Sequence, residues 1–576
     1  MGGGRWWNPA VAGALLAAAV LAGCASPPAQ LQQADQVAHA LVHQQQQQAL
    51  GQVADFQLSP LRRALRQRLL LQQGWPAAAP AVDPDNAAPA EAADGPLLLS
   101  LPLALEIAAG YSRDYQLQKE QLFQTALALD LEQERFRTSW RGLLGSLWSQ
   151  ERGQSPTLEG LHHSGDLALT RQLRQGASLA MGLALDLVQL LSGDRLVSRG
   201  LVADASISVP LLRGAGQAVV TEPLQQAERD LLYGLWSFDR YRRSFAVAVA
   251  SSYLQVLERN NQVRTAYDNY QRLIDSRRRA RRLADAGRLP EVQVDQALQD
   301  ELRARSRWVQ ARQNSLDALD RFKLQLGLPT DAQLALDDAE LARLQQSLAA
   351  ALTDRADDGA AEQALLRLAL RQRRDLLVAR GQVEDARRGI GVAEDALRAE
   401  LTLLGQAQAG ESRSLGQAGQ DDARLRPARG QYSALLQLDL ALERTAERNA
   451  LRNRWIELQQ AVRAVEALED NVKYEVRSAW RRLHEARETI TIEQQAVRVA
   501  RRRVASTSLF LRAGRIQMRD ALEAEDALVA ANNALVAAQV QYAIARMQLQ
   551  RDLDVLEPDT AGQWLLADWR PPQEQP

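Results

Sequence analysis

One long segment of this chain occurs twice, 227 residues apart, and this duplication limits the folds that the chain can adopt. Ala286-Gly287-Arg288 reappears as Ala513-Gly514-Arg515. After each of these turns, alanine recurs at every seventh position, and its small side chain lets two helices approach closely along their length. Each copy is therefore predicted to be a helix, a glycine turn and a returning helix. A generic coiled coil, matched by composition alone, is the alternative to duplication. The heptad alanines are Ala297, Ala304, Ala311 and Ala318 in one copy and Ala524, Ala531, Ala538 and Ala545 in the other.

Each half also contains segments in which apolar and polar residues alternate. In 178–187 the odd positions are leucine or methionine, and in 431–440 the even positions are mostly tyrosine or leucine. A period of two predicts strands with one apolar and one polar face. We expect two strands in the first half, at about 165–212, and two in the second, at about 399–442.

These strands have no predicted second sheet to cover their leucines, and a soluble protein would leave them in water. A membrane β-barrel accepts an apolar outer face and a polar inner face. Four strands cannot close a barrel, and open sheet edges are untenable in lipid. The barrel must therefore be shared between chains, and three chains would give twelve strands. A soluble amphipathic sheet packed on helices is the alternative.

The helix that opens each half matches at a different offset. Leu105-Glu106-Ile107-Ala108 meets Leu366-Arg367-Leu368-Ala369 at 261 residues rather than 227. The first half therefore carries 34 extra residues after its first helix. They include His162 and His163, and the sequence gives them no role.

The N-terminus has the pattern of an export signal. Arg5 precedes an apolar run that is too short to span a bilayer and ends in Leu21-Ala22-Gly23-Cys24. This tetrapeptide resembles the lipobox of bacterial lipoproteins, whose cysteine is lipidated and becomes the mature N-terminus. The residue after Cys24 is Ala25 rather than Asp, and the resemblance then implies an outer-membrane location.

The chain divides into a series of expected segments. Residues 1–23 are a signal peptide, and 24–96 are a lipid anchor and periplasmic linker with a short helix near Asp35 to Leu50. The first repeat occupies 97–330, with its helical hairpin at about 217–326. A connector at 331–361 leads to the second repeat at 362–557, with its hairpin at about 443–555. Residues 558–576 form a tail.

Composition and motifs exclude several classes of function. The net charge is −1, so there is no basic field for nucleic acid. The sequence lacks a P-loop, an HExxH motif, a nucleophile elbow and paired cysteine ligands. We therefore expect no enzyme activity, catalytic residue, cofactor or metal site, and any energy for transport would come from a partner.

Taken in their order along the chain, the repeats, turns and strands resemble those of the TolC family of outer-membrane efflux and secretion channels. The resemblance covers nearly all of the chain after Leu97. The resemblance rests on the duplicated plan, the two glycine turns, Val209-Pro210-Leu211-Leu212-Arg213-Gly214-Ala215-Gly216 and the registers of Ser251-Ser252-Tyr253-Leu254 and Ser478-Ala479-Trp480. It implies a homotrimer, with a twelve-stranded β-barrel in outer-membrane lipid continued by a periplasmic α-helical coiled-coil tunnel. Its partners would be a periplasmic adaptor protein and an inner-membrane pump.

The resemblance also assigns residues. The turns at Gly287, Arg288, Gly514 and Arg515 would form the periplasmic tip where the adaptor docks. Asp520 and Glu523 would form the pore constriction. They are three residues apart on one helix face, and threefold symmetry would make them an acidic ring. Simple solvation of both side chains is the alternative.

A second hypothesis uses the same helices without a pore. In it, the chain is a lipid-anchored periplasmic coiled-coil spacer, and its strand segments would be open to protease in intact cells.

Overall fold

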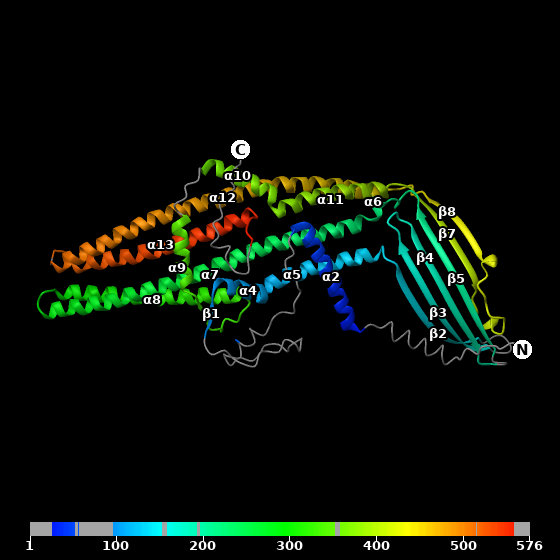
Figure 1. The fold of residues 1–576 in the computed structure, drawn as a ribbon, viewed down its shortest axis with the longest axis horizontal. Coiled ribbons are helices and arrows are strands. Elements are labelled where there is room, and N and C mark those ends of the chain that lie inside the picture. Colours follow the sequence, from blue (N-terminus) through cyan, green and yellow to red (C-terminus); the bar gives the residue numbers. More distant parts are fainter. Residues whose placement is uncertain are drawn as a thin grey trace. The chain divides into compact units, whose positions relative to one another are not determined.

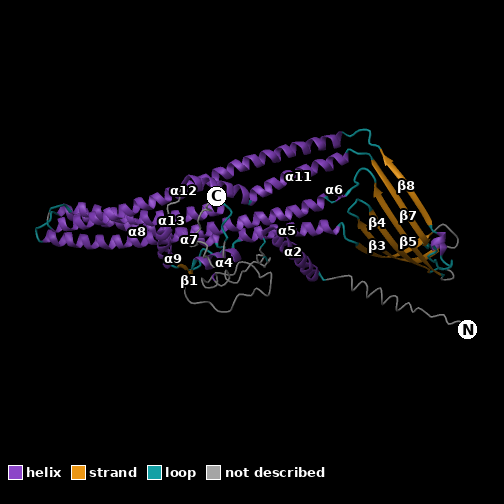
Figure 2. Ribbon diagram, turned by 45° about the horizontal axis from the view of Figure 1, so that its top comes forward, coloured by secondary structure: helices purple, strands orange, loops and turns teal. Residues whose placement is uncertain are grey.

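The computed structural model describes residues 26–51, 56, 69, 96–151, 158–192, 196–351, 358–513 and 515–557. The expected signal peptide, Cys24, Gly514 and the tail at 558–576 lie outside these residues. The chain is mainly helical with one large sheet, as the sequence predicts (Figure 1, Figure 2). It forms two compact units, one of 1–57, 122–235 and 379–463 and one of 58–121, 236–378 and 464–576.

The first unit contains a six-stranded antiparallel sheet in the order β2-β3-β4-β5-β7-β8. Its strands are β2 (Ser139–Glu151), β3 (Leu158–Gln172), β4 (Ser178–Leu190), β5 (Val197–Pro210), β7 (Glu400–Glu411) and β8 (Gln431–Asp439).

Helices α2 (Pro27–Leu50) and α6 (Gln217–Val220) lie in the first unit. Helix α2 contains the short helix expected near residue 35.

The second unit holds α4 (Leu101–Tyr111), α8 (Glu291–Gln325), α9 (Ala339–Ala351), α10 (Asp358–Gln372) and α13 (Met518–Asp552). It also holds a two-stranded parallel pair of β1 (Leu97–Leu99) and β6 (Leu334–Leu336). Four helices have residues in both units: α5 (Arg113–Glu134), α7 (Glu222–Asp285), α11 (Arg374–Ala396) and α12 (Thr445–Arg512).

The expectation of four strands per chain is wrong, because the first half contributes four strands rather than two. The extra segment of the first half forms the hairpin β2–β3 and carries both His162 and His163. The sequence of β2 does not show the alternation of apolar and polar residues that is typical of a strand. The apolar residues at 140, 144, 147 and 148 recur at helical spacing, which sequence patterns read as a helix.

Both predicted helical hairpins are present. Helix α12, which forms the first arm of the hairpin expected at about 443–555, is a single helix of 68 residues. The heptad alanines pack inward, since Ala297, Ala304 and Ala524 are each 1% exposed or less. By length and composition alone, α13 is the one described helix apolar enough to cross a membrane. Its buried alanines show that this composition serves packing in the hairpin.

The duplication extends to backbone hydrogen bonds at the turns. The N–H of Arg288 donates to the carbonyl of Leu283, and the N–H of Arg515 donates to that of Phe510. Both pairs are related by the same offset of 227 residues. This six-to-one bond is the Schellman ending of a helix. Gly287 has the positive φ of 71° that this ending requires.

The second unit encloses a cluster of buried charges. The side chain of Asp554 is fully buried and its carboxylate lies 3.0 Å from the Arg243 guanidinium. Its second oxygen accepts the N–H of Arg374 at 2.9 Å. Asp239 pairs with the same two arginines at 3.1 and 3.0 Å. These contacts join α7, the start of α11 and the chain just after α13.

A substitution at Asp554 tests this cluster. Asp554→Asn keeps the side-chain shape but removes one of the two carboxylates that pair with Arg243 and Arg374, so the positive charge of this buried cluster is no longer balanced and we expect a loss of about 3–5 kcal/mol. Thermal unfolding of the detergent-purified protein, followed by circular dichroism, would show the lowered Tm. Asp470→Asn is the matched control, because its pair with Lys473 is exposed and worth less than about 1 kcal/mol. Equal Tm values for the two variants would contradict the role of the cluster.

Candidate functional site

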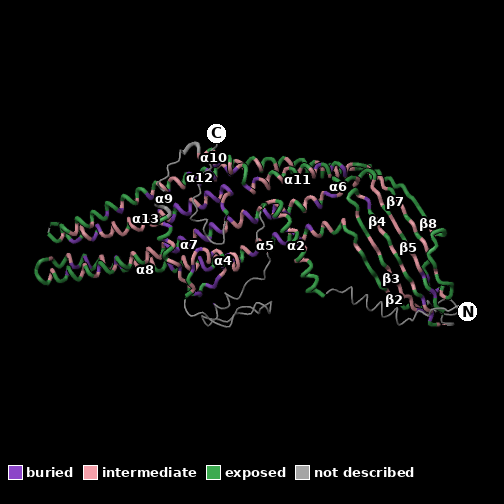
Figure 3. Tube along the Cα trace, viewed as in Figure 1, coloured by how far each residue is buried: buried purple, intermediate pink, exposed green. Residues whose placement is uncertain are grey.

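The sheet is amphipathic across all six strands. Directly paired residues share a face, and the register places Trp140, Leu169, Met181 and Ala205 in one row. Large exposed apolar side chains continue along this apolar face in every strand. Figure 3 shows the strands exposed or partly exposed over most of their length. The exposed members are Trp140, Leu144, Trp148, Leu167, Met181, Leu183, Leu185, Leu187, Val197, Ile207, Leu403, Tyr432, Leu436 and Leu438.

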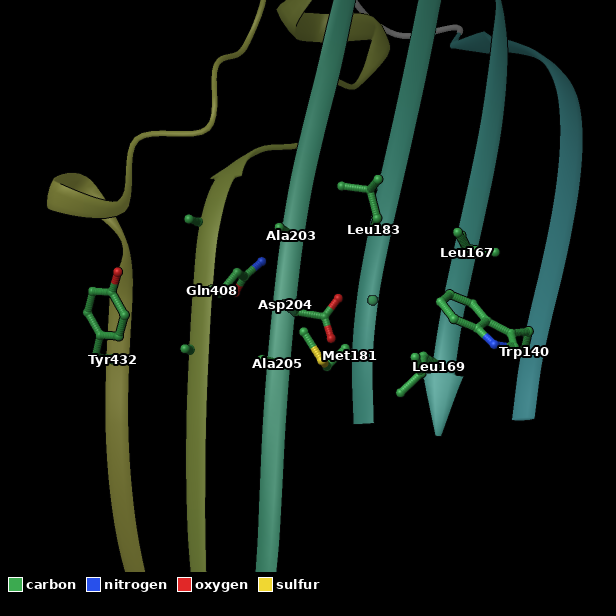
Figure 4. A pocket seen from close by; sticks show the side chains of 13 residues that line it. Trp140, Leu167, Leu169, Met181, Leu183, Ala203, Asp204, Ala205, Gln408 and Tyr432 are labelled. Atoms are coloured by element: carbon green, nitrogen blue, oxygen red, sulfur yellow. The ribbon is translucent and has the colours of Figure 1, made fainter. Parts of the chain in front are cut away.

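Small residues form a groove on the apolar face. Alanines of β5 and β7 line a depression of about 350 Å³, with Trp140 on β2 and Tyr432 on β8 among its other lining residues. Figure 4 shows Trp140 and Tyr432 on the two outer strands. An apolar face of this extent has no covering layer among the described residues.

The opposite face of the sheet is polar. Ser139 and Thr170 bond through their hydroxyls at 2.7 Å, and Asp204 fills the space above Gly182. His162 and His163 point to opposite faces, because neighbouring strand residues alternate. The His162 ring bonds Asp186 at 3.1 Å, whereas the His163 ring bonds Ser146 at 2.9 Å. The two histidines therefore do not form one site.

The loop between β7 and β8 folds over the polar face at one end of the strands. Leu415 packs on Val188 and Leu190. Arg413, 6% exposed, donates to the carbonyl of Asp421 at 2.9 Å and pairs with Glu411 at 2.8 Å. The sequence prediction missed this contact because a glycine-rich loop has no period.

The predicted constriction residues both have partners near the second turn. The carboxylate of Asp520 accepts the backbone N–H of Gln517 at 3.2 Å and completes a capping box at the start of α13. Glu523 lies 3.4 Å from Arg503 of α12, with both side chains about half exposed or more. The structure therefore places both acidic residues at the start of one helix. The partner of each carboxylate belongs to the same hairpin.

A third acidic residue near this turn was not predicted. Asp526 accepts two hydrogen bonds from Arg307 of α8, both at 3.0 Å, and a third from Asn269 of α7 at 3.1 Å. It thus connects the hairpin of the second half to that of the first. Burial raises the pKa of the adjacent Glu525 above its usual value, against the opposing charge of Arg272. Only folding brings these residues together, and no sequence spacing connects them.

The tip turns are short and exposed. Arg288 is exposed, and Gly287 has open space where a side chain would project. Arg515 is exposed in the matching turn. Arg281 near the first turn pairs with Asp285 and Glu291 at 3.1 and 2.5 Å.

The chain is similar to solved structures of outer-membrane channels and other membrane proteins. The structure of CusC, a protein that forms a transmembrane channel, has a TM-score of 0.55 and 16% identity over 79% of this chain and 91% of its own. The chain has the TolC-like fold of outer-membrane channels. The outer-membrane protein VceC of Vibrio cholerae gives a TM-score of 0.56 and 14% identity, over 79% of this chain and 95% of its own. The channel CmeC of Campylobacter jejuni gives 0.55 and 12%, over 84% and 95%. No protein-family model and no curated protein matches the chain.

In the TolC-like fold, one chain contains both the amphipathic sheet and the long helical hairpins. The family resemblance inferred from the sequence is confirmed at the level of the fold.

Neighbouring residues of β8 test the two faces of the sheet. Leu436 is 61% exposed on the apolar face, and Gln437 is exposed on the polar face. Leu436→Arg should cost about 2–4 kcal/mol in lipid, because its charge faces the acyl chains. Gln437→Arg is the control and should insert like the unchanged chain. The folded fraction in lipid vesicles, measured by protease protection, checks this. Equal insertion of both variants would exclude the membrane orientation of the sheet.

Proposed function

We propose that the chain is an outer-membrane channel that provides a passive exit duct for a tripartite efflux or type I secretion system. The observation that carries this proposal is the uncovered apolar face of a sheet whose opposite face is polar. Lipid is the one solvent that accepts an exposed apolar band of this kind around a polar interior. The TolC-like fold supports the same function.

One sheet cannot close on itself, so the proposed channel needs several copies of the chain, and the family resemblance implies three. Both β2 and β8 are edge strands, and their free backbone groups need partners in lipid. Copies of the same chain supply those partners in a closed ring. The polar face then lines the lumen, and the loop that carries Leu415 lies within the barrel mouth. The anchor at Cys24 would hold the mature chain on the outer membrane.

The hairpins extend the duct into the periplasm in this proposal. A helix of 68 residues is about 100 Å long at 1.5 Å per residue. The turns at Gly287, Arg288, Gly514 and Arg515 would meet the periplasmic adaptor, and an inner-membrane pump would supply the energy. The domain limits expected from the sequence belong to this proposal as well, except for the number of strands in the first repeat.

Fractionation and conductance test the function directly. The chain should sediment with the outer membrane, and the purified trimer should produce single-channel events in a planar bilayer. The rival spacer would leave the strands open to protease in intact cells and would conduct nothing. A soluble monomer without conductance would exclude the channel.

The acidic pair at the tip provides a second test. Asp520→Ala with Glu523→Ala removes up to six carboxylates from the threefold axis, so block by multivalent cations should weaken several-fold and conductance should rise. Glu466→Ala with Asp470→Ala is the control, since it removes the same charge from an exposed helix face elsewhere. Block is measured by titrating a trivalent cation against single-channel current. Unchanged block in the tip variant would remove Asp520 and Glu523 from the constriction.

A further inference from the structure

The hairpin β2–β3 is a full part of the sheet rather than an appendage. Every residue of β2 pairs with β3, from Ser139 with Thr170 to Glu151 with Leu158. Strand β3 then pairs with β4 from Gln172 with Ser178 to Gly160 with Leu190. The strands have 13 and 15 residues, as long as the 13 and 14 of β4 and β5. They are long enough to cross a bilayer when tilted.

The hairpin moves one free edge of the sheet from β4 to β2. The other free edge stays at β8. A neighbouring copy must therefore meet β8 with β2, if the hairpin belongs to the barrel, or with β4, if it does not. Side chains on the two edges distinguish these possibilities.

The polar face carries exposed leucines only on the two edge strands. Among the described residues, every other large exposed apolar side chain of the six strands lies on the apolar face. The exceptions are Leu143 and Leu147 of β2, 51% and 58% exposed, and Leu435 of β8, 54% exposed. Leucines on a water-filled lumen are unfavourable singly, but they bury one another if β8 of one copy lies beside β2 of the next.

One antiparallel register satisfies both faces of such a seam. If Leu435 lies opposite Gly145, the Leu435 side chain occupies the space that the glycine leaves free. It then packs between Leu143 and Leu147, the diagonal neighbours on the same face of β2. The same register sets Asp439 opposite Arg141, a pair of opposite charges. Asp439 pairs within its own chain with Glu400, a like charge, so the arginine of a neighbour offsets that repulsion.

The apolar face agrees with this register. It sets Leu436 opposite Leu144 and Tyr432 opposite Trp148. Aliphatic and aromatic cross-strand pairs of this kind stabilise neighbouring strands. Strand β2 leaves helix α5 and β8 leads into α12, so the two strands run in opposite directions, as the antiparallel register requires.

We propose that three copies close an 18-stranded barrel through a seam in which β8 of one copy pairs with β2 of the next, Leu435 facing Gly145. This inference rests on the proposed channel function. Six strands per chain, three times over, replace the twelve strands implied by the family resemblance. At a strand spacing near 4.8 Å and a tilt near 40°, the backbone diameter rises from about 24 Å to about 36 Å. The barrel lumen would then be wide enough for a porin-scale aqueous channel.

Cysteine pairs test the seam. Cys24 is the only cysteine of the chain, and its sulfur is acylated in the proposed lipoprotein. Leu436→Cys with Leu144→Cys should give covalent dimers and trimers on oxidation of the purified trimer, seen by gel electrophoresis without reductant. Leu185 lies on β4 at the height of Leu144 and would meet Leu436 if β8 paired with β4 at that height. Leu436→Cys with Leu185→Cys should remain monomeric. So should Leu436→Cys with Trp148→Cys, four residues away from the register.

The outcomes separate the inference from the function. Cross-linking of the 436/185 pair, or of the 436/148 pair in place of 436/144, would overturn the seam. Electron microscopy of the trimer should count eighteen strands, and twelve strands with a detached hairpin would also overturn it. In either case, single-channel conductance of the unchanged protein would leave the channel function intact, whereas a chain without conductance would refute that function first.

Discussion

Unpaired backbone groups at the two edges of the sheet are the constraint on which the rest of the structure depends. Strands β2 and β8 each present a row of free N–H and C=O groups, and the sheet's apolar face is uncovered. In water these edges would be solvated but the leucines would not be tolerated; in lipid the leucines are favourable but the edges are not. Closure with further copies, as in the proposed channel, would satisfy both requirements.

The helical part solves a different problem, namely how to hold long helices close together. Alanine at every seventh position brings the helices of each hairpin near one another. The hairpins contact each other through both apolar and polar side chains. Met518 and Leu522 of α13 share an apolar cluster with Leu273 of α7, and Asp526 accepts three hydrogen bonds from Arg307 and Asn269. At the start of α11, Asp375 is paired with Arg373 and with Arg240 of α7. Burial alone would raise the pKa of Asp375, but hydrogen bonds from Arg373 and the charge of Arg240 hold it below its usual value.

The sequence was sufficient for features that repeat and insufficient for those that do not. The duplication, the glycine turns and the strands β4, β5, β7 and β8 all carry a regular period, and each is present. The hairpin β2–β3 was missed because Trp140, Leu144 and Leu147 follow a helical spacing, while Leu143 and Leu147 break the alternation of β2. In the proposed seam, Leu143 and Leu147 face a neighbouring copy, which would account for the broken alternation of β2. Asp526 was missed because its partners lie on other helices.

An insertion of two strands also explains how one half can change while the helices keep their connections. A hairpin leaves and returns at the same rim of the sheet, so α5 still enters at that rim and β4 still begins there. A single added strand would reverse the direction of every strand after it, and the helices would then leave from the wrong end. Two strands are therefore the smallest insertion compatible with the fold. In the proposed trimer, the same rule keeps the strand number even and all neighbours antiparallel, so the barrel can widen while the number of helices stays the same.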